Sequence, residues 1–236
     1  MKGILKELRE ELAACSDEKV IQSSARFFKE AVSFHGVKSA DVQRIDKGFY
    51  ARIKDEGKDR IFALCDELWA APYFEENIIA CNWSHNQHKD YEPADLAVFE
   101  RWLGTYVTNW ATCDTLCNHT IGDLVTKYPE KIEELKRWAL SPNRWMRRGA
   151  AVSLIVPARK GLFLPEVFEI ATILLHDSDD MVQKGYGWML KVASQAHQHQ
   201  VYGYVMHHRA TMPRTALRYA IEKMPPALRS AAMEKP

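Results

Sequence analysis

The sequence predicts an all-α protein, an α-solenoid of stacked helix pairs that forms a single domain over residues 1–236. Apolar residues recur at helical spacing along almost the whole chain. No β-hairpin signature and no Val/Ile-rich alternating run competes with this pattern. The expected helices are short, about ten to seventeen residues each, and short connections join them.

In the N-terminal half, apolar spacing and caps mark the helices. The first helix carries an apolar face of Ile4, Leu5, Leu8 and Leu12. Ser16 and Asp17 are typical caps for a second helix that runs through Phe28, and a third helix begins near Ser39. The remaining expected helices of this half span residues 58–69, 73–85, 94–107, 110–126 and 129–140.

The C-terminal half continues the same pattern. The expected helices span residues 143–155, 165–176, 179–195, 198–208, 212–223 and 225–233. Four prolines fall at breaks or first turns, where a missing N–H costs little: Pro93, Pro129, Pro142 and Pro165. No exact repeat is visible, so the repeats of the solenoid are expected to be degenerate.

Charge is unevenly distributed along the chain. Residues 1–136 hold 18 Lys and Arg against 24 Asp and Glu, whereas residues 137–236 hold 14 against 7. Five of the nine histidines also lie in the second part. Two interpretations remain open: an anionic partner for the C-terminal half, or two surfaces that simply differ in charge.

Composition also limits location and chemistry. No run of about 18 apolar residues occurs, and Met1–Arg9 lacks the apolar core of a signal peptide. The five scattered cysteines are expected to be reduced thiols, and Cys113, Cys117 and His119 do not match a structural zinc spacing. We therefore expect a cytoplasmic monomer that does not bind membranes. Motifs for phosphate-binding loops, Ser-x-x-Lys and His-Glu-x-x-His are absent.

Two segments carry side chains suited to a site. Trp110 and Asp114 are four residues apart and share one face of a helix, although a core Trp beside a solvated Asp is the ordinary explanation of this spacing. Arg147 and Arg148 point about 100° apart on a helix, so at most one of them faces inward. A buried Arg needs a carboxylate or phosphate partner, whereas the alternative is a surface pair.

Two further segments suit a ligand or an anion. Gly185 and Gly187 interrupt a helical run at about 1 kcal/mol each, a cost that close helix packing or room for a ligand beside Trp188 would justify. The alternative is a core Trp with glycine packing contacts. Arg214 and Arg218 lie one turn apart, an arrangement that suits phosphates or forms a solvated basic face.

Together these segments resemble the AlkD-like DNA alkylation-repair family, HEAT-like-repeat proteins that include alkylpurine DNA glycosylases. The resemblance runs from about residue 20 to about residue 225 and includes Ala25–Lys29, Phe34–Lys38 and Leu68–Trp69. It implies an α-solenoid of degenerate HEAT-like helix pairs with a concave basic face. By position, Asp114 is similar to the catalytic carboxylate, Trp110 and Trp188 to the aromatic walls beside the lesion, and Arg148 to an arginine that holds the DNA backbone.

The resemblance implies hydrolysis of the N-glycosidic bond of cationic N3- or N7-alkylated purines in double-stranded DNA. No metal or organic cofactor is needed for that reaction, because an ionised Asp114 can oppose positive charge on the sugar and orient a water. Phosphates are expected to contact Arg148, Lys184, Arg214, Arg218 and Lys38.

The sequence departs from the family pattern near these residues. Asn109 and Ala111 flank Trp110 where the family can carry a second Trp and an additional acid, and Phe27 stands where some members have a Tyr. Some relatives lack glycosylase activity. The alternative function is therefore a non-catalytic helical-repeat binder of DNA structures or of a protein partner.

Overall fold

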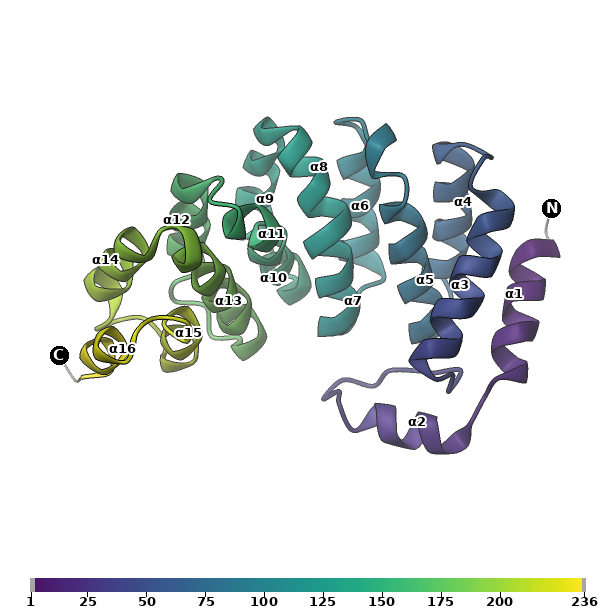
Figure 1. The fold of residues 1–236 in the computed structure, drawn as a ribbon, viewed down its shortest axis with the longest axis horizontal. Helices are drawn as coiled ribbons and strands as arrows, with labels where there is room; N and C mark the ends of the chain where they lie inside the picture. Colours follow the sequence, from purple (N-terminus) through teal and green to yellow (C-terminus); the bar gives the residue numbers. More distant parts are fainter. Residues whose placement is uncertain (1–2, 235–236) are drawn as a thin grey trace.

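The computed structural model describes residues 3–234 and consists of helices stacked side by side in an arch (Figure 1). Within that range there is no β-strand, and one isolated bridge joins Ser33 to Tyr73. Helices that lie next to one another in the stack pack together, as α4 does on α5, α10 on α13 and α13 on α15. The predicted all-α solenoid of helix pairs is therefore confirmed. No helix in residues 3–234 combines the length and apolar character needed to span a membrane.

The helical bounds match most of the ranges expected from apolar spacing. The first part of the chain forms α1 (Gly3–Ala14), α2 (Glu18–Ala25), α3 (Ser39–Ile53), α4 (Lys58–Trp69), α5 (Phe74–His85), the 3₁₀ turn η1 (His88–Asp90), α6 (Asp95–Thr105), α7 (Trp110–Thr115), the π-helical η2 (Leu116–Ile121) and α8 (Gly122–Lys127). The second part forms η3 (Pro129–Lys131), α9 (Ile132–Trp138), α10 (Arg144–Val152), α11 (Ile155–Arg159), α12 (Leu164–Ile173), α13 (Asp180–Ala196), α14 (Gln198–His208), α15 (Arg214–Ala220) and α16 (Pro226–Met233).

Six helices repeat at a nearly constant interval along the chain. The N-caps of α3, α5, α7, α10, α13 and α15 are Lys38, Tyr73, Asn109, Asn143, Asp179 and Pro213, which lie 34–36 residues apart. Three of these caps use their side chains, since Asn109, Asn143 and Asp179 each accept a hydrogen bond from a backbone N–H of the first turn. The sequence contains no exact repeat, but the degenerate repeat is visible in the spacing of these helix starts.

A continuous apolar core runs along the solenoid from Leu5 to Ala232. Its largest fully buried side chains include Trp69, Trp83 and Trp102. The Asp46 carboxylate, which enters this core, accepts hydrogen bonds from the Trp83 indole at 2.8 Å and the Asn82 amide at 2.7 Å. All five cysteines are free thiols, as predicted, and four of them are buried.

The segment after α2 differs from its predicted helical form. The helix ends at Ala25 rather than Phe28, and the chain then crosses the starts of α5 and α7 (Figure 1). The buried Glu75 carboxylate accepts the backbone N–H groups of His35, Gly36 and Val37 at 2.9–3.1 Å. These charge-assisted bonds replace helical ones and hold the segment against α5.

The predicted helix over 143–155 is also interrupted. It divides at Ser153 and Leu154 into α10 and α11. Pro157 explains the break, because proline lacks an N–H and its ring clashes with the carbonyl four residues earlier, which belongs to Ser153. That carbonyl instead packs tightly against Gly122 of α8.

Candidate functional site

Five of the eight sequence-predicted site residues line one cavity of about 420 Å³: Trp110, Asp114, Arg148, Lys184 and Trp188. They come from three helices, α7, α10 and α13, that are far apart in sequence and adjacent in the stack. The remaining lining residues are Phe27, Lys29, Glu30, Met181 and Tyr219. These five side chains, which come from separate sequence segments, therefore converge on one surface of the protein.

The repeat positions these side chains. Asp114, Arg148 and Lys184 are each the fifth residue after the N-cap of their helix. Trp110 is the first residue after its cap and Trp188 the ninth, so both lie on the same face as the fifth. In the other three helices the fifth residue is Gln43, Ile78 or Arg218, and each of these also lines a hollow of the surface.

Asp114 and Arg148 form a bidentate ion pair that lines the cavity. The guanidinium donates from Nε to Oδ1 and from Nη2 to Oδ2, both at 2.8 Å, and its Nη1 donates to the carbonyl of Met181. Arg148 is only 4% exposed, and Gly185 leaves room for its stem, since an added Cβ there would lie 3.3 Å from the Arg148 Cγ. Arg148 is thus the inward-facing member of its pair.

Its neighbour Arg147 points elsewhere. Its Nε donates to the Asp177 carboxylate at 2.6 Å, and its Nη1 donates to the carbonyls of Ser141 and Pro142. None of these residues lines the cavity of Asp114. The protein therefore contains a second shielded Arg–Asp pair that is separate from the site.

Burial dominates the electrostatics of this ion pair. Loss of water raises the pKa of Asp114, and the hydrogen bonds and positive charge of Arg148 offset that effect only in part. Burial acts in the opposite direction on the pKa of Arg148, but the bonds and charge of Asp114 outweigh it, so the pKa of Arg148 is raised. A poorly hydrated carboxylate held in this way can interact strongly with a positive charge that enters the cavity.

Trp110 is not a core residue. It is 36% exposed and stacks on Phe28, with ring centroids 5.7 Å apart and planes 24° apart. Phe28 in turn packs against Phe34 and Phe74. The indole is thus supported on one side and open on the other, while the half-buried Trp188 lines the same cavity from α13. The interpretation of Trp110 as a core side chain is excluded.

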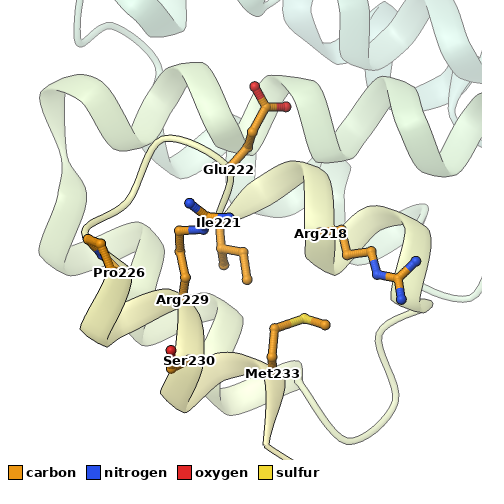
Figure 2. A pocket seen from close by; sticks show the side chains of 7 residues that line it. All are labelled: Arg218, Ile221, Glu222, Pro226, Arg229, Ser230 and Met233. Carbon is orange, nitrogen blue, oxygen red and sulfur yellow. The ribbon is translucent and has the colours of Figure 1, made fainter.

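The predicted basic residues divide into two groups. Lys184 lines the cavity, where its ammonium pairs with Asp180 at 2.9 Å. Arg214 is exposed and donates to the carbonyl of Met233, and Arg218 lines a separate hollow of about 600 Å³ between α15 and α16 (Figure 2). Lys38 is exposed at the start of α3 and lines neither hollow.

Sequence patterns did not identify the contribution of the segment after α2. Phe27, which is 75% exposed, Lys29 and Glu30 reach the cavity from this segment. Ion pairs attach it there, since Lys29 lies 3.6 Å from Asp180 and Glu30 lies 3.5 Å from Arg144. The Ala25–Lys29 motif was a signal for the segment, but nothing local indicated where it would fold.

The fold and the site define a class of protein: a helical-repeat protein whose repeated helices bring a carboxylate–arginine pair and two indoles into one cavity. The family model described as DNA alkylation repair enzyme matches residues 8–224, and the chain therefore belongs to that family. A solved structure titled predicted DNA alkylation repair enzyme, from Enterococcus faecalis, has the same fold with a TM-score of 0.80. It is 13% identical, and the match covers 89% of this chain and 97% of that one. Among proteins of curated function, none matches the chain.

Proposed function

We propose that the protein is a DNA glycosylase that hydrolyses the N-glycosidic bond of cationic N3- or N7-alkylated purines in duplex DNA. The observation that carries this proposal is the position of Asp114, a shielded carboxylate held by Arg148 in a cavity bounded by Trp110 and Trp188. Membership of the DNA alkylation repair enzyme family supports the choice of substrate.

The chemistry of the lesion explains why so few groups suffice. An alkyl group at N3 or N7 makes the purine cationic, and the base then leaves as a neutral molecule with little need for acid catalysis. Positive charge develops on the deoxyribose, where the Asp114 carboxylate can stabilise it and orient the attacking water. Arg148 keeps the carboxylate in place through both of its oxygens.

The indoles have a second role in this proposal. Trp110 and Trp188 can present electron-rich faces to the cationic nucleotide, contacts that contribute about 0.5–2 kcal/mol each. They also exclude water, which strengthens the field of the carboxylate. Lys29 and Lys184 beside the cavity, with Arg214, Arg218 and Lys38 farther along the surface, are the groups available to contact phosphates.

Release of 7-methylguanine and 3-methyladenine from methylated duplex DNA tests the proposal. Asp114→Asn should reduce the single-turnover rate by at least about 100-fold, because it removes the charge that opposes the sugar cation. Binding of undamaged duplex should change little. The matched control is Asp177→Asn, which removes the same charge from the second Arg–Asp pair, outside the cavity, and should retain base release.

Absence of base release by the unmodified protein at low salt, with DNA binding intact, would exclude a glycosylase. Equal rates for the protein and Asp114→Asn would remove Asp114 from the mechanism. A fall in rate with Asp177→Asn as large as that with Asp114→Asn would mean that loss of an ion pair, rather than of the cavity carboxylate, explains the effect.

One observation favours a second candidate, a non-catalytic binder of DNA structures or of a protein partner. Both oxygens of Asp114 already accept hydrogen bonds from Arg148, so the carboxylate has fewer free positions for a water. This alternative predicts binding to bulged, nicked or branched DNA, or to a protein, with no loss of bases. The same release assay, run beside a binding assay on those DNA forms, separates the two functions.

A further inference from the structure

A group of metal-ligating side chains lies at the end of α5 that points away from the proposed active site. His85 ends α5, His88 lies in η1, and Asp123 lies in the first turn of α8. One ligand atom from each residue lies within 4.8 Å of the others. We propose that these three residues bind a divalent transition-metal ion of the zinc class, and that His119 is close enough to become a fourth ligand.

The position of α5 separates this cluster from the cavity of Asp114. Phe74, which begins the helix, contacts Phe28 and through it Trp110. His85 ends the same helix, 11 residues later, or about 16 Å along its axis. Neither His85 nor Asp123 lines the cavity of Asp114. The proposed ion is therefore remote from the proposed glycosidic chemistry, which needs no metal.

Helical spacing places the four side chains in two pairs. His85 and His88 are three residues apart, and His119 and Asp123 are four apart, so each pair can share a face of its turn or helix. His119 lies in the π-helical η2, a rare geometry that is frequent at functional sites. Chain segments more than 30 residues apart thus contribute two potential ligands each.

The distances between these side chains are close to those between ligands of one bound metal ion. The His85 Nε2 lies 3.0 Å from the Asp123 Oδ2, where an ion could bridge the two. With Zn–N bonds of about 2.1 Å, two imidazoles on a tetrahedral ion have ring centroids about 5.4 Å apart. The ring of His85 lies 5.4 Å from that of His88 and 5.3 Å from that of His119. Inward movement of the side chains on the order of 1 Å would complete the coordination.

The surroundings suit an ion of this class. The His88 Nδ1 is hydrogen-bonded to the carbonyl of His85 at 3.0 Å, which leaves its Nε2 as the ligand atom and fixes the ring. Imidazole combined with one carboxylate favours Zn²⁺, Cu²⁺ or Ni²⁺ over Mg²⁺ or Ca²⁺. A plain surface ion pair between His85 and Asp123 is the competing explanation, but it does not require the two other imidazoles.

The proposal is tested by titrating the untagged 236-residue protein with ZnCl2 or CoCl2, after a chelator has removed any bound metal. Calorimetry should give one saturable site per chain, and bound Co²⁺ should show the visible absorption of low-coordinate nitrogen and oxygen ligation. His88→Ala and Asp123→Asn should each weaken binding at least about tenfold, since loss of even a second-shell partner changes affinity by about 10–100-fold.

The matched control is the double variant His207→Ala/His208→Ala, which removes another adjacent pair of imidazoles from α14. It should bind the metal as the unmodified protein does. The side chain of His88 is partly exposed and lies in the short turn η1, so its removal should change thermal unfolding of the metal-free protein little. The proposal would be overturned if the unmodified protein showed no saturable binding, or if His88→Ala and Asp123→Asn bound the metal as tightly as the unmodified protein. Base release is expected to be the same with and without chelator, so the two proposals fail independently.

Discussion

Replacing Gly187 by alanine tests how closely α13 and α15 approach each other. A Cβ added at Gly187 would lie 2.7 Å from the Cβ of Tyr219 and 2.8 Å from the carbonyl oxygen of Ala216. Both atoms belong to or adjoin the backbone of α15, so no flexible side chain can swing aside. Helix α15 would have to move, and Tyr219, which lines the cavity, would move with it.

The magnitude follows from two opposing contributions. Alanine in place of glycine in a helix stabilises it by about 0.8–1 kcal/mol. Overpacking a well-packed contact costs about 1–3 kcal/mol, and contact with backbone favours the upper part of that range. We expect Gly187→Ala to lower the free energy of unfolding by about 1–2 kcal/mol, which corresponds to roughly 2–8 °C in Tm for a chain of this size.

Gly203→Ala is the matched control. Gly203 also lies inside a helix, α14, and nothing lies within 4 Å of an added Cβ. This variant should be stabilised by up to about 1 kcal/mol. Urea and thermal unfolding of both variants measure the difference. If Gly187→Ala were as stable as Gly203→Ala, the close approach of α13 and α15 would not be the reason for the glycine.

Two other predictions concern the ion pair in the cavity. Because burial raises the pKa of Asp114, base release should fall as pH decreases, with a midpoint above the ordinary aspartate pKa of about 3.9. A pH–rate profile with its midpoint at or below the ordinary aspartate pKa would contradict this prediction. Because the pKa of Asp114 is higher in the folded state than in the unfolded state, its protonation stabilises the fold. This contribution is complete at a pH below the pKa of the unfolded state, and it is lost as pH rises through the pKa of the folded state. Arg148→Met should destabilise the protein by about 3 kcal/mol, since it leaves the carboxylate without its partner. Unfolding measurements on Arg148→Met, Asp114→Asn and the double variant should give a coupling energy; purely additive effects would mean that the pair contributes nothing.

Much of the fold was predictable because helical spacing and capping are local properties. Asp17 and Asn143 cap helices at or beside the expected positions, and the interval between Trp110 and Asp114 put both on one face whatever the tertiary structure. The order of segments in the family resemblance then linked Asp114 to Arg148. Local pattern gave the face of each helix, and the family order indicated which faces meet.

The parts that were missed depend on contacts between distant residues. Phe27 and Phe28 continue the apolar spacing of α2, but Phe28 stacks on Trp110 and the helix ends before it. Glu75, which holds the backbone of this segment, reads locally as an ordinary acidic residue in the first turn of a helix. Pro157 was a visible signal for the break between α10 and α11, and its effect on Ser153 could have been anticipated.

In the six repeated helices, the position five residues after the N-cap contributes to the surface rather than to the apolar core. Each such residue stands on its own helix, and the six lie in the order Gln43, Ile78, Asp114, Arg148, Lys184 and Arg218. Two uncharged side chains are followed by one acid and then by three cations. Substitutions at these positions can change the affinity or the reactivity of the surface one helix at a time, while the apolar residues that hold the stack together remain the same. A single carboxylate in this series restricts any reaction to one place along a bound polymer.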